Sequence, residues 1–144
     1  MCEERLGWLS GQLTGAPDQP TVILMHHPPF RTGIAYMDRI GLDGADAMAE
    51  IVEQHRNIQR ILCGHIHRPI QAMWAGTGVQ VAPAPAHQVM LDLKGDPNNG
   101  CMIMEPPACM LHLWHPSAGL VSHVSYVGKF EGPRSFRKSP AANA

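Results

Sequence analysis

The feature that most constrains the fold is a pair of short apolar runs with a helical pattern between them. The runs are TVILM at residues 21–25 and RILCG at residues 60–64. Short runs of this kind are typical of strands that are covered on both faces of a sheet. Between them, apolar side chains recur at helical spacing: Met48, Ile51 and Val52. Strand, helix and strand form a βαβ unit whose strands run parallel, and the sequence therefore predicts an α/β fold.

The rest of the chain divides into an amino-terminal helix, a region of short strands and a tail. Leucines at helical spacing, followed by Gly15, predict a helix over residues 3–14. From Pro69 onward, alternating segments separated by turns indicate strands that we expect to pair antiparallel; they are residues 79–81, 89–93, 110–114 and 120–127. We expect residues 1–131 to form one folded unit and residues 132–144, which lack periodicity, to form a flexible tail.

Composition and charge exclude several classes of partner. The formal net charge is -1, from 11 basic and 12 acidic residues, which provides no positive surface for a nucleic acid polymer. No apolar run approaches the roughly 20 residues that span a bilayer, and the first residues lack the apolar core of a signal peptide. We therefore expect a cytoplasmic protein without a membrane partner. The four cysteines show no C-x-x-C spacing, so we expect reduced thiols.

Histidines follow both predicted strands. Because the carboxyl ends of parallel strands lie at one edge of a sheet, His26 and His27 should meet His65 and His67 in a single crevice. In an extended segment, the α-carbons of alternate residues are about 6.5 to 7 Å apart on one face, so His65 and His67 could bind one cation or two neighbouring ones. Imidazole suits zinc, iron, manganese or cobalt. The pattern predicts a metal site, although the H-x-H motif alone fits two hydrogen-bonded surface histidines equally well.

Two further histidines have weaker claims to a site. His55 lies on the apolar face of the predicted helix, where it is expected to pack. His87 lies in a Pro-rich loop beside the sheet, and its role stays open because such a loop could reach the crevice.

The order of the motifs resembles a known enzyme family. VILMHHPP followed by ILCGHIHRP is similar to the last two motifs of the calcineurin-like binuclear metallophosphoesterases, and above all of the class III cyclic-nucleotide and glycerophosphodiester phosphodiesterases. The stretches TGIAYMDRIGLDGADAMAEIV, AHQVMLDL and EPPACMLHLW also resemble that subgroup. The resemblance implies the α/β/β/α sandwich of a hydrolase that cleaves small phosphodiesters.

The resemblance also implies roles for individual residues. His26 and His65 would bind one metal ion and His67 the other, and the paired ions, which would be Fe, Mn, Zn or Co, would stabilise charge on the attacking and leaving oxygens. His27 would lie beside the ions or face the substrate. Asp38 and Arg39 would line the phosphodiester pocket, with a plain surface ion pair as the alternative.

The family's amino-terminal motifs are absent from this sequence. It contains no D-x-H, and its only Gly-Asp pair is Gly95-Asp96 in a predicted turn. We therefore expect the carboxyl-terminal half of such an enzyme, which alone would bind at most one metal ion, weakly, and have little or no activity. The alternative is a noncatalytic metal-binding or oligomerisation module. A half-domain exposes an apolar sheet face, so a homo-oligomer is expected.

Overall fold

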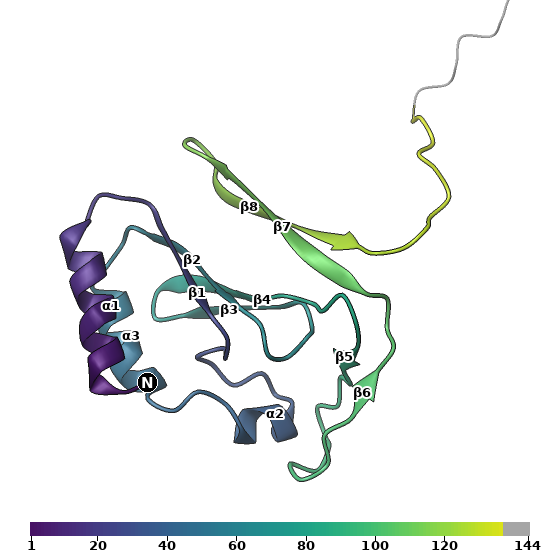
Figure 1. Cartoon of the computed structure of the whole chain (residues 1–144), viewed down its shortest axis with the longest axis horizontal. Coiled ribbons are helices and arrows are strands. Elements are labelled where there is room, and N and C mark those ends of the chain that lie inside the picture. Colours follow the sequence, from purple (N-terminus) through teal and green to yellow (C-terminus); the bar gives the residue numbers. More distant parts are fainter. Residues whose placement is uncertain (137–144) are drawn as a thin grey trace, which may run out of the picture.

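The computed structural model describes residues 1–136, and its centre is a four-stranded mixed sheet (Figure 1). The strands are β1 (Thr21–Met25), β2 (Ile58–Cys63), β3 (Ile70–Trp74) and β4 (Thr77–Val81), in the order β1-β2-β4-β3. Three helices accompany them: α1 (Glu3–Gly15), α2 (Ala35–Arg39) and α3 (Ala45–Glu53). The α/β class is therefore confirmed. Most of the expected tail, residues 137–144, lies outside the described residues.

The predicted βαβ unit is present. β1 and β2 pair parallel, with Ile23 opposite Ile61 and Met25 opposite Cys63, and α3 lies in the connection between them. The predicted first helix and first strand are also confirmed, with bounds that differ by at most one residue. These elements could be predicted because their apolar spacing and turn residues favour the same structures that the packed protein contains.

The pairing of β4 differs from the sequence prediction. We expected antiparallel pairing for the strand around residues 79–81, but β4 pairs parallel with β2 and antiparallel only with β3. Strand β3 was not predicted at all. It joins β4 through Ala75 and Gly76, whose φ angles of 48° and 74° are those of a two-residue hairpin turn. The β3–β4 hairpin thus lays β4 against β2, so that three successive parallel strands share one carboxyl edge.

The core lies between this sheet and helices α1 and α3. Apolar side chains from the sheet and both helices form it, including Ile61, Val79 and Val81 from the sheet and Met48 from α3, none more than 1% exposed. Burial of each such side chain contributes about 1.5–3 kcal/mol. The helices therefore fix the sheet whose edge carries the histidines.

The remaining strands form two antiparallel pairs. β5 (Gln88–Val89) pairs with β6 (Met102–Ile103), and β7 (Ala108–His115) pairs with β8 (Gly119–Tyr126). The antiparallel pairing predicted for this region is confirmed here, although β5 is much shorter than expected and β6 was not predicted. The β7–β8 hairpin extends over the sheet and away from it (Figure 1). Within residues 1–136, no helix has the length and apolar character needed to cross a membrane.

Candidate metal centre

The carboxyl ends of β1, β2 and β4 meet at one edge of the sheet. Backbone hydrogen bonds continue past the strand ends, since the Gly64 N–H donates to the His26 carbonyl at 3.0 Å and the Ala82 N–H donates to the Cys63 carbonyl at 2.9 Å. The three loops that follow these strands are thereby held side by side. They carry His26 and His27, then His65 and His67, then His87.

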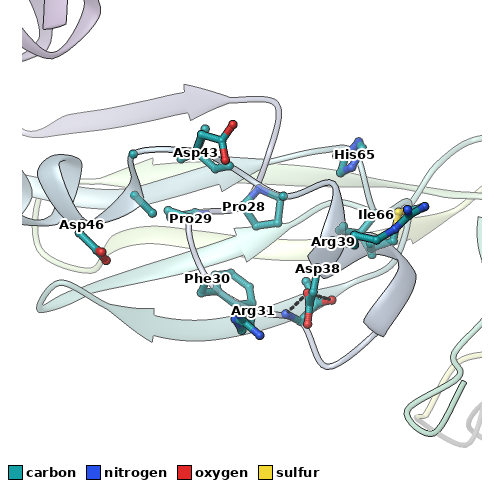
Figure 2. Close-up of a pocket in the computed structure, with 16 residues that line it drawn as sticks. Pro28, Pro29, Phe30, Arg31, Asp38, Arg39, Asp43, Asp46, His65 and Ile66 are labelled. Carbon is teal, nitrogen blue, oxygen red and sulfur yellow. Dashed lines mark hydrogen bonds between the residues drawn. The ribbon is translucent and has the colours of Figure 1, made fainter. Parts of the chain in front are cut away.

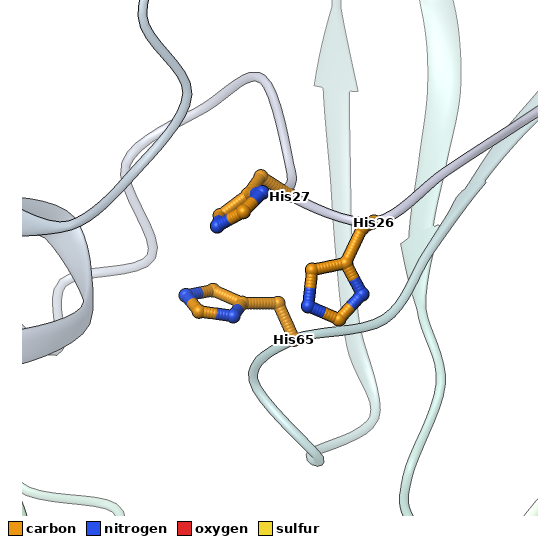
Figure 3. Close-up of side chains that lie close together, drawn as sticks. All are labelled: His26, His27 and His65. Carbon is orange, nitrogen blue, oxygen red and sulfur yellow. The ribbon is translucent and has the colours of Figure 1, made fainter.

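Three of these histidines form a compact cluster (Figure 3). Their ring centroids lie 4.9 Å apart for His26 and His27, 5.1 Å for His26 and His65, and 4.1 Å for His27 and His65. One nitrogen from each of the three rings lies within 4.8 Å of the others. A single cation between those nitrogens requires only small movements of the rings, because zinc–nitrogen bonds are about 2.0–2.1 Å long.

The loop that carries His65 and His67 is not extended. Strand β2 ends at Cys63, and the φ angles of His65 and His67 are 66° and 53°. The Ile66 N–H donates to the Gly64 carbonyl at 2.7 Å, which closes a tight turn around His65. The prediction of an extended H-x-H segment with both rings on one face is therefore wrong. His65 joins His26 and His27, whereas the ring of His67 lies 4.8 Å from that of His87.

Two ring nitrogens in this loop have no partner. His65 Nε2 and His67 Nδ1 are buried and make no hydrogen bond among the described residues. Buried polar atoms are nearly always satisfied, and both of these nitrogens remain available as ligand atoms. Burial, and then the neighbouring His27, His26 and His67, lower the pKa of His65. The neutral imidazole that this favours is the form that binds a metal ion.

Arg68 holds the histidine loop to the strands that follow. Its guanidinium nitrogen Nη1 donates to the Val89 carbonyl at 2.7 Å and to Glu105 Oε2 at 2.6 Å. The Arg68 side chain is only 14% exposed. The ion pair therefore connects the residue after His67 to β5 and to the segment after β6.

A pocket of about 390 Å³ lies between the loop after β1 and the turn around His65 (Figure 2). Asp38 and Arg39 line it, and so do Arg31 and His65. Asp38 accepts hydrogen bonds from the Thr32 N–H and hydroxyl and from the Gly33 N–H, at 2.7–2.9 Å. Its carboxylate is thus engaged in holding the loop. Asp38 and Arg39 do not form the ion pair considered as an alternative, because Arg39 lies over the Tyr36 ring, 5.6 Å from its centroid.

His87 is the histidine at this edge whose role sequence reasoning left open. The signal that identifies it is the direction of β4, since a parallel β4 delivers the loop after it to the same edge as the other histidines. The cluster of close ligand groups in residues 1–136 contains imidazoles and no carboxylate. Within residues 1–136, this cluster therefore provides nitrogen ligands without the anionic ligands that would balance the charge of a cation.

Comparison with known proteins identifies relatives. The chain is 41% identical over 137 residues to a probable glycerophosphodiester phosphodiesterase GpdQ of Arcobacter nitrofigilis, covering 94% of this chain and 50% of that protein. The chain is homologous to phosphodiesterases. A probable cyclic nucleotide phosphodiesterase of Rhodopseudomonas palustris is 43% identical over 97 residues, or 67% of this chain and 35% of that protein. The 3',5'-cyclic adenosine monophosphate phosphodiesterase CpdA of Escherichia coli is 30% identical over 88 residues, or 61% and 32%.

These relatives confirm the resemblance to glycerophosphodiester and cyclic-nucleotide phosphodiesterases that the motifs predicted, and hence a resemblance to enzymes. No protein-family model matches the chain. The chain spans half the length of the Arcobacter relative and about a third of the other two.

Proposed function

We propose that this chain forms part of a cytoplasmic, metal-dependent hydrolase that cleaves small phosphodiesters of the glycerophosphodiester or cyclic-nucleotide type. The observation that carries the proposal is the pair of buried, unpartnered nitrogens His65 Nε2 and His67 Nδ1 beside the imidazoles of His26 and His27. The names of the relatives support the reaction class.

His26, His65 and His67 are the residues that would hold the metal ions. His26 and His65 lie close enough to share one ion, and His67, on the other side of the turn, suits a second. Bound cations of this kind polarise the phosphoryl oxygen and stabilise the charge that develops in phosphodiester cleavage. In this proposal His27 and His87, whose rings lie beside those of His65 and His67, would hydrogen-bond an anionic phosphodiester.

The pocket beside His65 would receive the alcohol part of the substrate. Its volume of about 390 Å³ falls in the range of small-molecule sites. Arg31 and Arg39 place positive charge along its wall, and neither makes an ion pair with a described residue. The same wall also carries the carboxyl groups of Asp38, Asp43 and Asp46. Asp38 acts indirectly in this proposal, because its carboxylate fixes Thr32 and Gly33 at the pocket wall.

The centre is incomplete within this chain. Neutral imidazoles do not balance the charge of two divalent cations, and a buried uncompensated charge is costly. We therefore expect at most one weakly bound ion and little or no turnover from residues 1–144 alone. The carboxylates would come from polypeptide outside this sequence, in keeping with relatives that are about twice as long.

A noncatalytic assembly module is the second candidate. Large apolar side chains are exposed along the β7–β8 hairpin, with Leu113 61%, Leu111 55% and Tyr126 60% exposed. Association of copies through this hairpin would bury them and would yield the expected homo-oligomer. Sedimentation over a range of protein concentrations measures this association directly.

Cobalt binding tests the metal centre. We expect the absorption bands of bound Co²⁺ to appear on titration of the chain, and the His26→Ala, His65→Ala and His67→Ala variants each to bind at least tenfold more weakly. His123→Ala is the matched control, because His123 is exposed on β8 outside the cluster. Unchanged binding in all three variants would remove the site assignment.

Hydrolysis of a chromogenic phosphodiester tests the reaction. A protein extended upstream of residue 1 should bind two ions and cleave the diester, whereas the present chain should not. If the longer protein neither holds two ions nor cleaves the diester, the assembly module is the better account.

A further inference from the structure

Helix α2 carries an aromatic ring that the proposed metal centre does not use. Tyr36 and Arg39 are three residues apart in α2, a spacing that places two side chains on the same side of a helix. The central carbon of the Arg39 guanidinium lies over the Tyr36 ring, 5.6 Å from its centroid. A cation within about 6 Å of a ring centroid is attracted to the ring face. The ring therefore favours one position of Arg39, at the wall of the pocket that His65 also lines (Figure 2).

The contact with the ring leaves the charge of Arg39 uncompensated. Three carboxyl groups line the same pocket, those of Asp38, Asp43 and Asp46. Arg39 forms an ion pair with none of them, and it makes no hydrogen bond within residues 1–136. An uncharged ring attracts the guanidinium but does not neutralise it. The N–H groups of Arg39 thus stay free to donate to an anion, and a guanidinium can bind two phosphate oxygens at once.

The segment between β5 and β6 limits where the Tyr36 ring can lie. Gly100, just before β6, lies so close to the ring that a Cβ added at residue 100 would be 2.6 Å from Tyr36 Cγ and closer still to Cδ1 and Cε1. Cβ atoms essentially never approach other atoms within 3.0 Å, so only glycine fits here unless the ring moves. Because Cγ joins the ring to the rest of the side chain, a small swing of the far end of the ring would not clear the added atom. The backbone at Gly100 therefore holds the ring on which Arg39 lies.

We infer that Tyr36 is a positioning residue for the binding of the phosphodiester. Its ring, held by Gly100, keeps the Arg39 guanidinium at the pocket wall with its N–H groups free to bind the anionic oxygens of the ester. Tyr36 acts through Arg39 and needs no contact with the substrate, so the ring is required and the phenol hydroxyl is not. This inference rests on the proposed function, because it concerns the substrate of that site.

Binding of dimethyl phosphate to the whole chain in EDTA tests the inference. This phosphodiester carries one negative charge and no other functional group, and EDTA removes any contribution from metal ions. Titration followed by NMR gives its dissociation constant, and the Arg39 Nε–H signal reports on the ring beside it. Tyr36→Leu removes the ring, whereas Tyr36→Phe keeps it. Tyr126→Leu is the matched control, because Tyr126 is 60% exposed on β8 and does not line the pocket.

We expect dimethyl phosphate to bind the unaltered chain. Tyr36→Leu should weaken this binding about twofold to fivefold, as the loss of an exposed cation–π contact predicts. The Arg39 Nε–H signal should also move in Tyr36→Leu before any ester is added. Tyr36→Phe and Tyr126→Leu should bind as the unaltered chain does. No binding by the unaltered chain, undiminished binding by Tyr36→Leu, or an equal loss in Tyr36→Phe or Tyr126→Leu would each overturn the inference.

A double variant separates positioning from general damage to the pocket. Arg39→Gln should itself weaken binding, and Tyr36→Leu should add no further loss in that background, because the ring acts only through Arg39. An equal loss from Tyr36→Leu with and without Arg39 would refute the positioning role.

Gly100→Ala gives the same test without removal of the ring. It should weaken binding as Tyr36→Leu does, because the added Cβ displaces the ring. Gly11→Ala in α1 is its control and should bind normally, since an added Cβ there meets nothing within 4 Å. Normal binding by Gly100→Ala would refute the role given to the segment between β5 and β6.

The cobalt titration of the histidine variants is independent of these measurements. Ester binding that depends on Tyr36, together with cobalt binding that no histidine variant affects, would refute the proposed metal centre and not the positioning role. Cobalt binding that depends on the histidines, together with ester binding that Tyr36→Leu leaves unchanged, would refute the positioning role alone.

Discussion

The ion pair between Arg68 and Glu105 offers a sharp test of how the histidine loop is held. Arg68 donates from one nitrogen to Glu105 at 2.6 Å and to the Val89 carbonyl at 2.7 Å. In Arg68→Ala both bonds are lost. The Val89 carbonyl then lies in a residue that is 6% exposed, whereas the Glu105 side chain, at 39% exposed, regains contact with water.

The expected loss in free energy of unfolding for Arg68→Ala follows from this difference in burial. A fully buried ion pair costs about 3–5 kcal/mol when one partner is removed. Because Glu105 is partly solvated, leaving its carboxylate unpaired costs less than that range. The unpaired Val89 carbonyl adds about 1 kcal/mol or more. We therefore expect Arg68→Ala to lower the free energy of unfolding by about 2 kcal/mol. Arg134 and Glu131 form the control pair, at 2.5 Å with side chains 81% and 86% exposed, and Arg134→Ala should cost less than about 0.5 kcal/mol.

Urea unfolding followed by circular dichroism measures both variants. A loss below about 0.5 kcal/mol in Arg68→Ala, or an equal loss in Arg134→Ala, would refute the reasoning, because burial would then not decide the strength of these pairs. The double variant with Glu105→Ala isolates the pair itself. We expect the sum of the losses in the Arg68→Ala and Glu105→Ala variants to exceed the loss in the double variant by about 1 kcal/mol.

Three further predictions concern stability and local structure. Gly7→Ala in α1 should raise the free energy of unfolding by about 0.5–1 kcal/mol, since an added Cβ meets nothing within 4 Å. Gly44→Ala should lower the free energy of unfolding, because φ is +76° at this residue. Thermal unfolding measures both variants. Burial raises the pKa of Cys63 to about 12, so its thiol should resist thiol reagents at pH 8 until the chain unfolds. The fold favours the protonated form of that thiol. The contribution of the Cys63 thiol to stability is therefore complete below about pH 9 and is lost between about pH 9 and 12. Unfolding measured at several pH values would show or disprove this loss. Asp38→Ala should speed hydrogen exchange at Thr32 and Gly33, because its carboxylate accepts their N–H groups, and unchanged exchange would contradict the structural role assigned to it.

The parts of the fold that could be predicted are those that local patterns determine. The apolar run of β1 and the leucine spacing of α1 each carry their own signal, and the βαβ unit follows from the order of the elements. Strand β3 gave no such signal, because Met73 is apolar yet 75% exposed and breaks the alternation. The direction of β4 relative to β2 is a tertiary property that no local pattern determines.

That direction also decides which histidines can meet. Two histidine clusters could be placed at one edge from sequence, because β1 and β2 belong to a βαβ unit. His87 could not, since antiparallel pairing of β4 would have sent its carboxyl end to the opposite edge. The parallel pairing of β2 and β4 brings the ring of His87 to 4.8 Å from that of His67. In this chain, the direction of β4 therefore decides whether His87 lies with the other histidines.

In the proposed metal centre, the positive φ angles of His65 and His67 would connect the fold to metal affinity. Each costs roughly 1–2 kcal/mol in a residue with a side chain, and the turn persists because its neighbours hold it in place. Ile66, between the two histidines, is 1% exposed in the core, and Arg68 binds the next segment. Because the protein folds with the rings of His65 and His67 already beside those of His27 and His87, an ion bound in the proposed centre would not have to supply that strain energy. Ile66 and Arg68 should therefore contribute to metal affinity although neither offers a ligand atom.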